Sequence, residues 1–154
     1  MSVLPVVLWP DARLKQVCAP VAGEDMAALA ADMLDTMYAA PGRGLAGPQV
    51  GVMRRIFVMD ASWKQGTPSP RICIDPVITP LGDDLATMEE GCLSIPDRPV
   101  RMTRPARVRL DYTDETGTAR SIELSGAEAA IAQHEADHLD GRLIIDDQPE
   151  PFPA

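Results

Sequence analysis

The stretch AIAQHEADHLDG, Ala130 to Gly141, is the most informative part of the sequence, because it contains both histidines of the 154-residue chain. His134 and His138 are four residues apart, and positions i and i+4 share one face of an α-helix. On such a helix the two imidazoles could bind one metal ion. Glu135 would be turned by about 100° from His134 and could act beside the ion as a base. The pattern is therefore interpreted as the H-E-x-x-H motif of metal-assisted hydrolysis.

A helix bearing this motif is predicted from about Ser125 to Asp140. Ser125 is expected to be the N-cap, and Glu128 follows three residues later, as in a capping box. Gly141 directly follows the last helical residue and is expected to end the helix.

A third protein ligand is needed, because a catalytic metal site usually has three protein ligands and one open position. A metzincin-like site would require a histidine at position 144, where the sequence has Ile144. A thermolysin-like site would require a downstream glutamate, and the only one is Glu150, in a proline-rich tail. The remaining option is an upstream cysteine thiolate, and Cys92 in EEGCLSIP stands out because a glycine precedes it.

The other two cysteines are interpreted differently. Cys73 lies in the apolar run RICIDP and is expected to be a core residue, whereas Cys18 lies in a proline-bounded loop. Three widely spaced cysteines make a disulfide framework improbable, which favours a reducing, cytoplasmic location. A Cys-His-His site would suit zinc, cobalt, nickel or ferrous iron.

Composition excludes several classes of protein. Hydrophobic residues make up 45% and charged residues 24% of the chain, as in ordinary globular proteins. The net charge of −9 argues against nucleic-acid binding. No run approaches the ~18 apolar residues of a membrane span, and the N-terminus does not resemble a signal peptide. The length predicts one domain, residues 1–154.

The remaining elements follow a segregated order. A helix with an apolar stripe rich in methionine is predicted over Glu24–Ala40. Strands are predicted over 55–60 and 71–78, around Cys92, and in a hairpin of 106–114 and 118–126 around the turn DETG. A helix, then strands, then a C-terminal metal-binding helix predicts an α+β fold with antiparallel or mixed sheets.

Three ordered segments together resemble the peptide deformylase family, which removes the formyl group from the initiator formyl-methionine of new bacterial polypeptides. GRGLAGPQ, 42–49, is similar to its G-φ-G-L-A-A-x-Q motif, in which φ is apolar. EGCLS, 90–94, and QHEADH, 133–138, match its E-G-C-L-S and Q-H-E-x-D-H motifs. The resemblance extends over nearly the whole chain.

The resemblance implies a role for each motif residue. The metal ligands would be Cys92, His134 and His138, holding Fe²⁺ in vivo, with Zn²⁺, Ni²⁺ or Co²⁺ as replacements and water or hydroxide in the fourth position. Glu135 would take the proton from that water as it attacks the formyl carbon. The Gln49 amide and the Leu93 backbone N–H would stabilise the tetrahedral oxyanion.

Substrate contacts are implied for eight residues: Arg43, Gly44, Met88, Glu90, Gly91, Ala127, Ala130 and Ile131. Arg43 stands where the family has valine or isoleucine, and Ala127 and Ala130 stand where it tends to have leucine and isoleucine. These departures predict a wider or altered pocket. Gly47 replaces an alanine and is expected to loosen its loop, while Asp75 replaces the usual asparagine and adds a negative charge near a turn.

Two contacts of the helix are also predicted. Glu90 is a candidate to pair with Arg104, and Asp137 is expected to tie the helix to a neighbouring segment.

The expected function is hydrolysis of N-formyl-methionyl peptides, with a transient ribosome contact implied by the family. Alternatives are a paralogue that prefers another N-acyl group or another first residue, and a catalytically silent binding protein.

Overall fold

The structure is a computed structural model, which describes residues 2–146. Its α-helices are α1 (Ala27–Ala39) and α2 (Gly126–Leu139), and short 3₁₀ turns are η1 (Ala12–Lys15), η2 (Gly47–Val50) and η3 (Trp63–Gln65). Its strands are β1 (Gly44–Ala46), β2 (Ile56–Met59), β3 (Arg71–Pro80), β4 (Leu85–Cys92), β5 (Ile95–Pro105), β6 (Arg107–Thr113) and β7 (Ala119–Ser125). The expected α+β architecture with antiparallel sheets and a C-terminal helix is confirmed.

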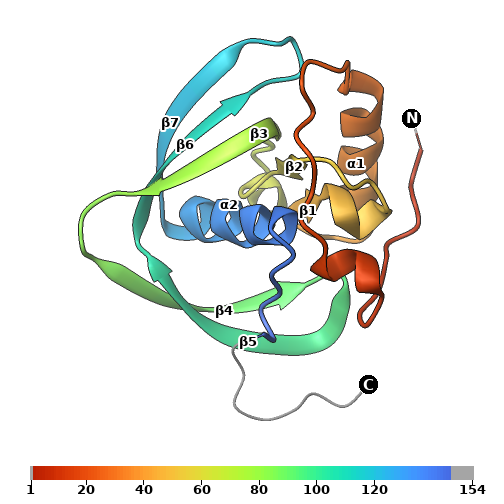
Figure 1. The fold of residues 1–154 in the computed structure, drawn as a ribbon. Coiled ribbons are helices and arrows are strands. Elements are labelled where there is room, and N and C mark those ends of the chain that lie inside the picture. The colour runs from red at the N-terminus through yellow and green to blue at the C-terminus, as the bar shows by residue number, and fades with distance from the viewer. Residues whose placement is uncertain (1, 147–154) are drawn as a thin grey trace.

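The strands form a five-stranded antiparallel sheet in the order β1-β2-β3-β6-β7 and a separate β4-β5 pair. Figure 1 shows α2 between these two sheets, with α1 beside β1 and β2. Strand β2 is buried throughout, because alternate side chains meet different helices. Phe57 and Met59 pack in the cluster that contains α2 residues, whereas Ile56 and Val58 pack with α1.

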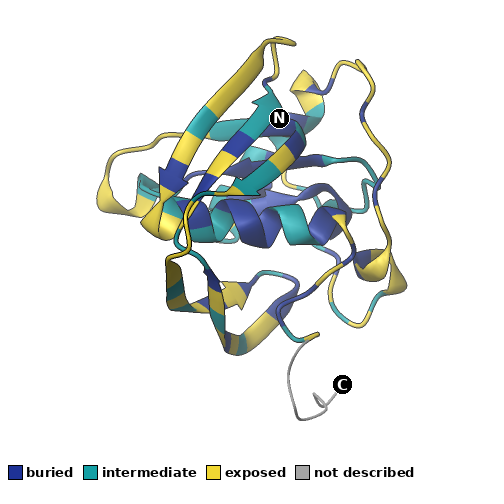
Figure 2. Ribbon diagram, turned by 60° about the vertical axis from the view of Figure 1, so that its left-hand side comes forward, coloured by how far each residue is buried: buried dark blue, intermediate teal, exposed yellow. Residues whose placement is uncertain are grey.

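Helix α2 is largely buried, as the dark segments of Figure 2 show. It ends as predicted, since Gly141 has φ +72°, the left-handed conformation that glycine adopts readily. The predicted capping box at its start is wrong, because the Ser125 side chain makes no capping hydrogen bond. Ser125 is the extended last residue of β7, and Glu128 lies instead 3.8 Å from Arg71.

Helix α1 begins three residues later than predicted. Met26 is the N-cap, and the carboxylate of Asp25 before it accepts a hydrogen bond from the Ala27 amide at 3.0 Å, so both acidic residues precede the helix. The predicted apolar stripe is confirmed: Ala30, Met33 and Met37 are fully buried against β1 and β2.

Two strands were missed in the sequence. Strand β1 lies within the glycine-rich motif, and β5 contains three prolines, which are normally confined to strand edges and ends. Both are edge strands, β1 of the five-stranded sheet and β5 of the pair, where missing amide donors are tolerated. The hairpin of β6 and β7 is confirmed, with Thr113 opposite Ala119.

The expectation that Gly47 loosens its loop is wrong. Gly47 is buried, and a Cβ there would lie 2.6 Å from the carbonyl oxygen of Val52 and 2.8 Å from that of Arg54. The missing methyl group therefore lets two backbone segments pack closely. Asp75 adopts φ +48° at an irregularity of β3, and its carboxylate accepts a hydrogen bond from the Val21 amide at 2.8 Å.

Candidate metal centre

Three buried side chains from β4 and α2 converge between the two sheets. One ligand atom from each of Cys92, His134 and His138 lies within 4.8 Å of the other two. The Cys92 Sγ atom is 3.4 Å from Nε2 of His138, and the two imidazole rings are 5.0 Å apart. A thiolate and two imidazoles are ligands that a divalent transition metal accepts. The fold thus brings together the three residues that the sequence singled out.

An ion-pair chain orients the first imidazole. Glu90 accepts a hydrogen bond from Nδ1 of His134 at 3.1 Å, which leaves Nε2 directed to the cluster. Arg104 donates to both oxygens of Glu90 at 2.7 and 2.9 Å and to Asp137 at 2.8 Å. The predicted pairing of Glu90 with Arg104 and the tie made by Asp137 are both confirmed. This carboxylate–histidine arrangement is typical of metal sites.

The pKa values of Glu90, His134 and His138 are shifted in different directions by their surroundings. Burial raises the pKa of Glu90, but hydrogen bonds from His134 and Arg104 outweigh it and lower the pKa below its usual value. Burial also lowers the pKa of His134, yet Glu135, Cys92 and Glu90 hold it well above the usual value. Burial, together with His134 and Arg104, lowers the pKa of His138 well below normal. A neutral imidazole is the form that binds a metal ion.

Glu135 lies beside the cluster in a confined, largely dry position. Its Oε2 atom is 4.0 Å from Nε2 of His134, and burial is the largest of the effects that raise its pKa to about 7. A Cβ atom at Gly44 would lie 2.4 Å from the same oxygen, so only glycine leaves room for the carboxylate. Among residues 2–146, nothing forms a hydrogen bond with Oε1 of Glu135.

Gln49 is fixed at both ends of its amide. Its Oε1 accepts from the Ala46 N–H at 2.9 Å, which orients the NH₂ group toward Ser94 Oγ at 3.1 Å and Cys92 Sγ at 3.6 Å. The amide NH₂ of Gln49 therefore points into the cluster.

The side chain of Leu93, the neighbour of Cys92, packs against Gly42, where a Cβ would lie 2.8 Å from Leu93 Cδ1.

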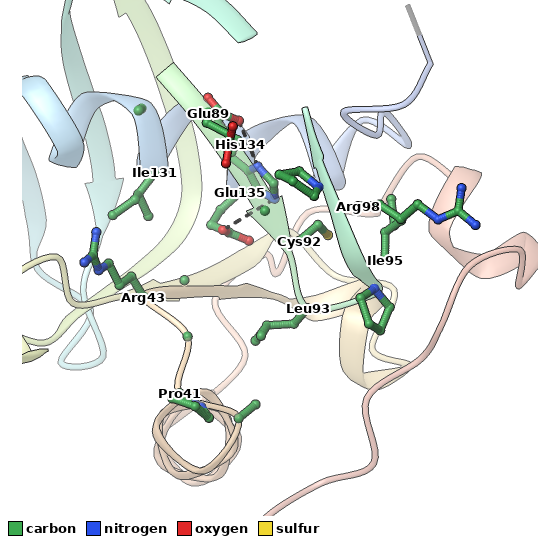
Figure 3. A pocket seen from close by; sticks show the side chains of 18 of the residues that line it. Pro41, Arg43, Glu89, Cys92, Leu93, Ile95, Arg98, Ile131, His134 and Glu135 are labelled. Carbon is green, nitrogen blue, oxygen red and sulfur yellow. Dashed lines mark hydrogen bonds and ion pairs between the residues drawn. The ribbon is translucent and has the colours of Figure 1, made fainter. Parts of the chain in front are cut away.

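A cavity of about 740 Å³ opens onto the cluster, and Figure 3 shows it from close by. Its walls include all eight residues expected to contact substrate: Arg43, Gly44, Met88, Glu90, Gly91, Ala127, Ala130 and Ile131. Lys64, Asp97 and Arg98 also line it. Sequence reasoning did not identify them, because Lys64 lies in η3 and Asp97 and Arg98 lie in β5, outside the three motifs. Glu150, the alternative ligand considered above, lies outside residues 2–146.

The buried Cys-His-His group beside a glutamate in an open cavity defines a hydrolase-type site suited to a metal ion. The family model described as polypeptide deformylase matches residues 3–151. The chain belongs to the peptide deformylase family. Membership makes it an enzyme, a hydrolase of protein N-terminal processing.

Relatives match over almost the whole chain. The peptide deformylase of Brucella suis biovar 1 is 47% identical over 149 residues, which cover 95% of this chain and 85% of the relative. A class I type b peptide deformylase from Acinetobacter baumannii superposes with a TM-score of 0.90 at 31% identity, covering 95% of this chain and 99% of that one. One from Synechococcus elongatus, solved in complex with actinonin, gives 0.87 at 36%, covering 93% and 79%.

Neither α1 nor α2, the α-helices of residues 2–146, has the length and apolar character needed to cross a bilayer.

Proposed function

We propose that the protein removes the N-formyl group from N-formyl-methionyl peptides of nascent proteins, with a divalent metal ion. The observation that carries this proposal is the convergence of the Cys92, His134 and His138 ligand atoms within 4.8 Å at the end of a substrate-sized cavity. Family membership supports the reaction, and the structures of relatives with actinonin support a ligand site in this cavity.

Cys92, His134 and His138 would hold the ion, which we infer to be Fe²⁺ in vivo, with Zn²⁺, Ni²⁺ or Co²⁺ as substitutes. The ion when bound would supply Lewis acidity, lowering the pKa of a water ligand and polarising the formyl carbonyl. Glu90 would keep His134 in the tautomer that presents Nε2, because it accepts the Nδ1 hydrogen.

Glu135 would move the proton. The attacking water would lose its proton to the Glu135 carboxylate as its oxygen bonds to the formyl carbon. The same carboxyl group would then pass the proton to the peptide nitrogen as the C–N bond breaks, releasing formate and a free amino group. The unpartnered Oε1 and the raised pKa of Glu135, about 7, suit a group that both accepts and returns a proton near neutrality.

Gln49 and Leu93 would stabilise the oxyanion that forms on the formyl oxygen. The Gln49 NH₂ is already oriented by the hydrogen bond between its Oε1 and Ala46, so little reorganisation is needed. The Leu93 backbone N–H would be the second donor. Removing one such donor typically lowers kcat by about 10²–10³-fold.

The wider assignment follows the same reasoning. We infer one catalytic domain over residues 1–154, a cytoplasmic location and a transient contact with the ribosome, without direct binding of nucleic acid. A catalytically silent binding protein is disfavoured, because Glu135, Gln49 and all three candidate ligands are retained. A paralogue with a different substrate preference is favoured by one observation, the presence of Arg43 in the cavity wall.

The test is the release of formate from formyl-Met-Ala-Ser by nickel-loaded protein, with Glu135→Ala as the inactive control. Metal content of the wild type, Cys92→Ala and Glu135→Ala is measured by mass spectrometry. We expect one ion per chain in the wild type and Glu135→Ala, loss in Cys92→Ala, and turnover in the wild type alone. Stoichiometric metal without formate release would reject the substrate assignment.

A further inference from the structure

Arg43 places a cation in the wall of the cavity. Its backbone is held at the start of β1, because its carbonyl oxygen accepts a hydrogen bond from the Asp60 amide at 2.9 Å. The side chain lines the cavity, and Figure 3 shows it with Ile131 on one side of the pocket, across from Cys92 and Arg98. The Arg43 side chain therefore forms part of the cavity wall that a bound peptide would meet.

The guanidinium has an unsatisfied donor. Its Nε atom is buried, and no group in residues 2–146 accepts a hydrogen bond from it. The carboxylates that line the cavity do not neutralise it: Glu90 is paired with Arg104 and His134, and no ion pair within that part of the chain joins Arg43 to Glu89, Asp97 or Glu135. A buried donor without an acceptor is energetically costly, so a rotation of the Arg43 side chain that lets its guanidinium meet an acceptor on a ligand is favourable.

The part of the cavity wall formed by α2 leaves room for such a ligand. Helix α2 contributes Ala127 and Ala130 to the cavity, and both side chains are a single methyl group. The cavity is lined by charges of both signs: three cations, Arg43, Lys64 and Arg98, and four carboxylates, Glu89, Glu90, Asp97 and Glu135. The walls thus combine apolar surface with charged groups, of which Glu90 is already paired with Arg104 and His134.

Resting on the function proposed above, we propose that Arg43 is a specificity-determining residue that binds a side-chain carboxylate on the first or second residue of the formyl-peptide. A guanidinium binds a carboxylate through two parallel N–H···O bonds, which a neutral amide of the same shape cannot match. The two positions share this chemistry, and the peptide series below separates them.

The test compares matched peptides that differ only in charge. Formyl-Met-Asp-Ser is compared with formyl-Met-Asn-Ser, and formyl-Glu-Ala-Ser with formyl-Gln-Ala-Ser. For the wild type we expect kcat/KM to be at least about tenfold higher for the acidic member of one pair, which identifies the position. In Arg43→Met, which keeps an unbranched side chain but removes the charge, that ratio should fall close to one.

Lys64→Met is the matched control, because it removes one cavity cation that is exposed and does not carry the unsatisfied Nε. We expect it to change the ratio by less than about twofold at physiological salt, where exposed charges are screened. If Lys64→Met lowers the acidic-to-neutral ratio of kcat/KM as much as Arg43→Met does, any nearby cation produces the preference, and the proposal is overturned. So would a wild-type ratio near one for both pairs.

A binding measurement keeps this inference separate from the proposed function. Nickel-loaded Glu135→Ala and the double variant Glu135→Ala/Arg43→Met are titrated with the same four peptides by calorimetry. We expect an acidic peptide to bind about tenfold more tightly than its neutral partner only when Arg43 is present. Equal Kd values, or no binding of acidic peptides at millimolar concentration, would reject the role of Arg43. Loss of turnover on formyl-Met-Ala-Ser would instead reject the reaction.

Discussion

The carboxylate of Glu135 and the backbone of Gly44 are in such close contact that a Cβ on Gly44 would lie 2.4 Å from Oε2 of Glu135. The next closest atoms, Cδ and Cγ of Glu135, would be at 2.9 and 3.0 Å. The edge strand β1 therefore sets how near the helix glutamate can come to the cluster. A side chain at position 44 would therefore force the Glu135 carboxylate out of the position that it occupies here.

Gly44→Ala is expected to displace the Glu135 carboxylate and lower kcat by about 10²–10⁴-fold, the usual contribution of a positioned base. The loss should occur with metal still bound, since the three atoms nearest to the added Cβ all belong to Glu135 and not to a candidate ligand. Formate release and metal content, measured on the same sample, check this prediction.

The same clash should lower the free energy of unfolding of Gly44→Ala, and a double-mutant cycle tests whether Glu135 is its cause. In a Glu135→Ala background the clashing atoms are absent, so Gly44→Ala should no longer lower the free energy of unfolding. If the destabilisation is the same in both backgrounds, the clash with Glu135 is not its origin.

Arg104 is expected to be the most sensitive residue of the ion-pair chain. Arg104→Gln would remove the arginine partner of the buried Glu90 carboxylate and leave it only the hydrogen bond from His134, and losing one partner of a buried ion pair costs about 3–5 kcal/mol of stability. It would also release the support of His134, and metal affinity should fall by about 10–100-fold. Chelator competition and denaturant unfolding measure the two effects.

Arg142→Gln is the control for that variant. Arg142 also contacts Asp137, at 3.6 Å, but its side chain is 66% exposed, and exposed ion pairs contribute about 0–1 kcal/mol. Metal affinity should stay unchanged. A comparable loss in both variants would show that charge near Asp137 matters rather than the buried pair with Glu90.

Trp63 holds the rim of the cavity that Arg43 and Gly44 form. Its Nε1 donates to the Gly42 carbonyl at 2.8 Å, while its ring packs edge-on against Tyr38 at 5.2 Å. Trp63→Phe keeps the ring contact and removes the hydrogen bond, which contributes about 0.5–1.5 kcal/mol. We expect a higher KM with little change in kcat.

The neighbouring exposed residue Gln65 serves as the control for the rim, and Gln65→Ala should leave both KM and kcat unchanged. The rim interpretation fails if Trp63→Phe lowers kcat while KM stays constant.

Because of Asp114, the free energy of unfolding is expected to depend on pH, independently of the metal centre. Hydrogen bonds from Thr116 and Arg120 are the main causes that hold the pKa of its carboxyl well below the ordinary value of 3.8. A lowered folded-state pKa gives stabilisation that is present above about pH 4 and is lost as the pH falls toward the folded-state pKa.

Asp114→Asn should therefore be less stable than the wild type at pH 7, and the difference should narrow as the pH is lowered below about 4. Denaturant unfolding of the metal-free proteins at several pH values measures it. Glu115→Gln, an exposed change in the same turn, should retain the wild-type pH profile. A difference that stays constant with pH would exclude the charge of Asp114 as the cause.

Local patterns in the sequence carried much of the site. The spacing of His134 and His138 fixes a shared helical face, because the α-helix repeats every 3.6 residues. The strands of the DETG hairpin and the buried face of α1 follow from equally short-range periodicities. The edge strands β1 and β5 were not predicted, because glycine and proline obscure the alternation of polar and apolar residues on which strand prediction depends.

The helical histidine pair, the choice of Cys92 as their partner and the family resemblance could all be predicted from the sequence. The ion-pair chain of Glu90, Arg104 and Asp137 and the close approach of Gly44 to Glu135 became known only from the packed structure. It also showed Gly47 to be tightly packed rather than loose. The physical reason is that helix and hairpin patterns are local, whereas close approaches between distant segments depend on how both sheets pack around α2.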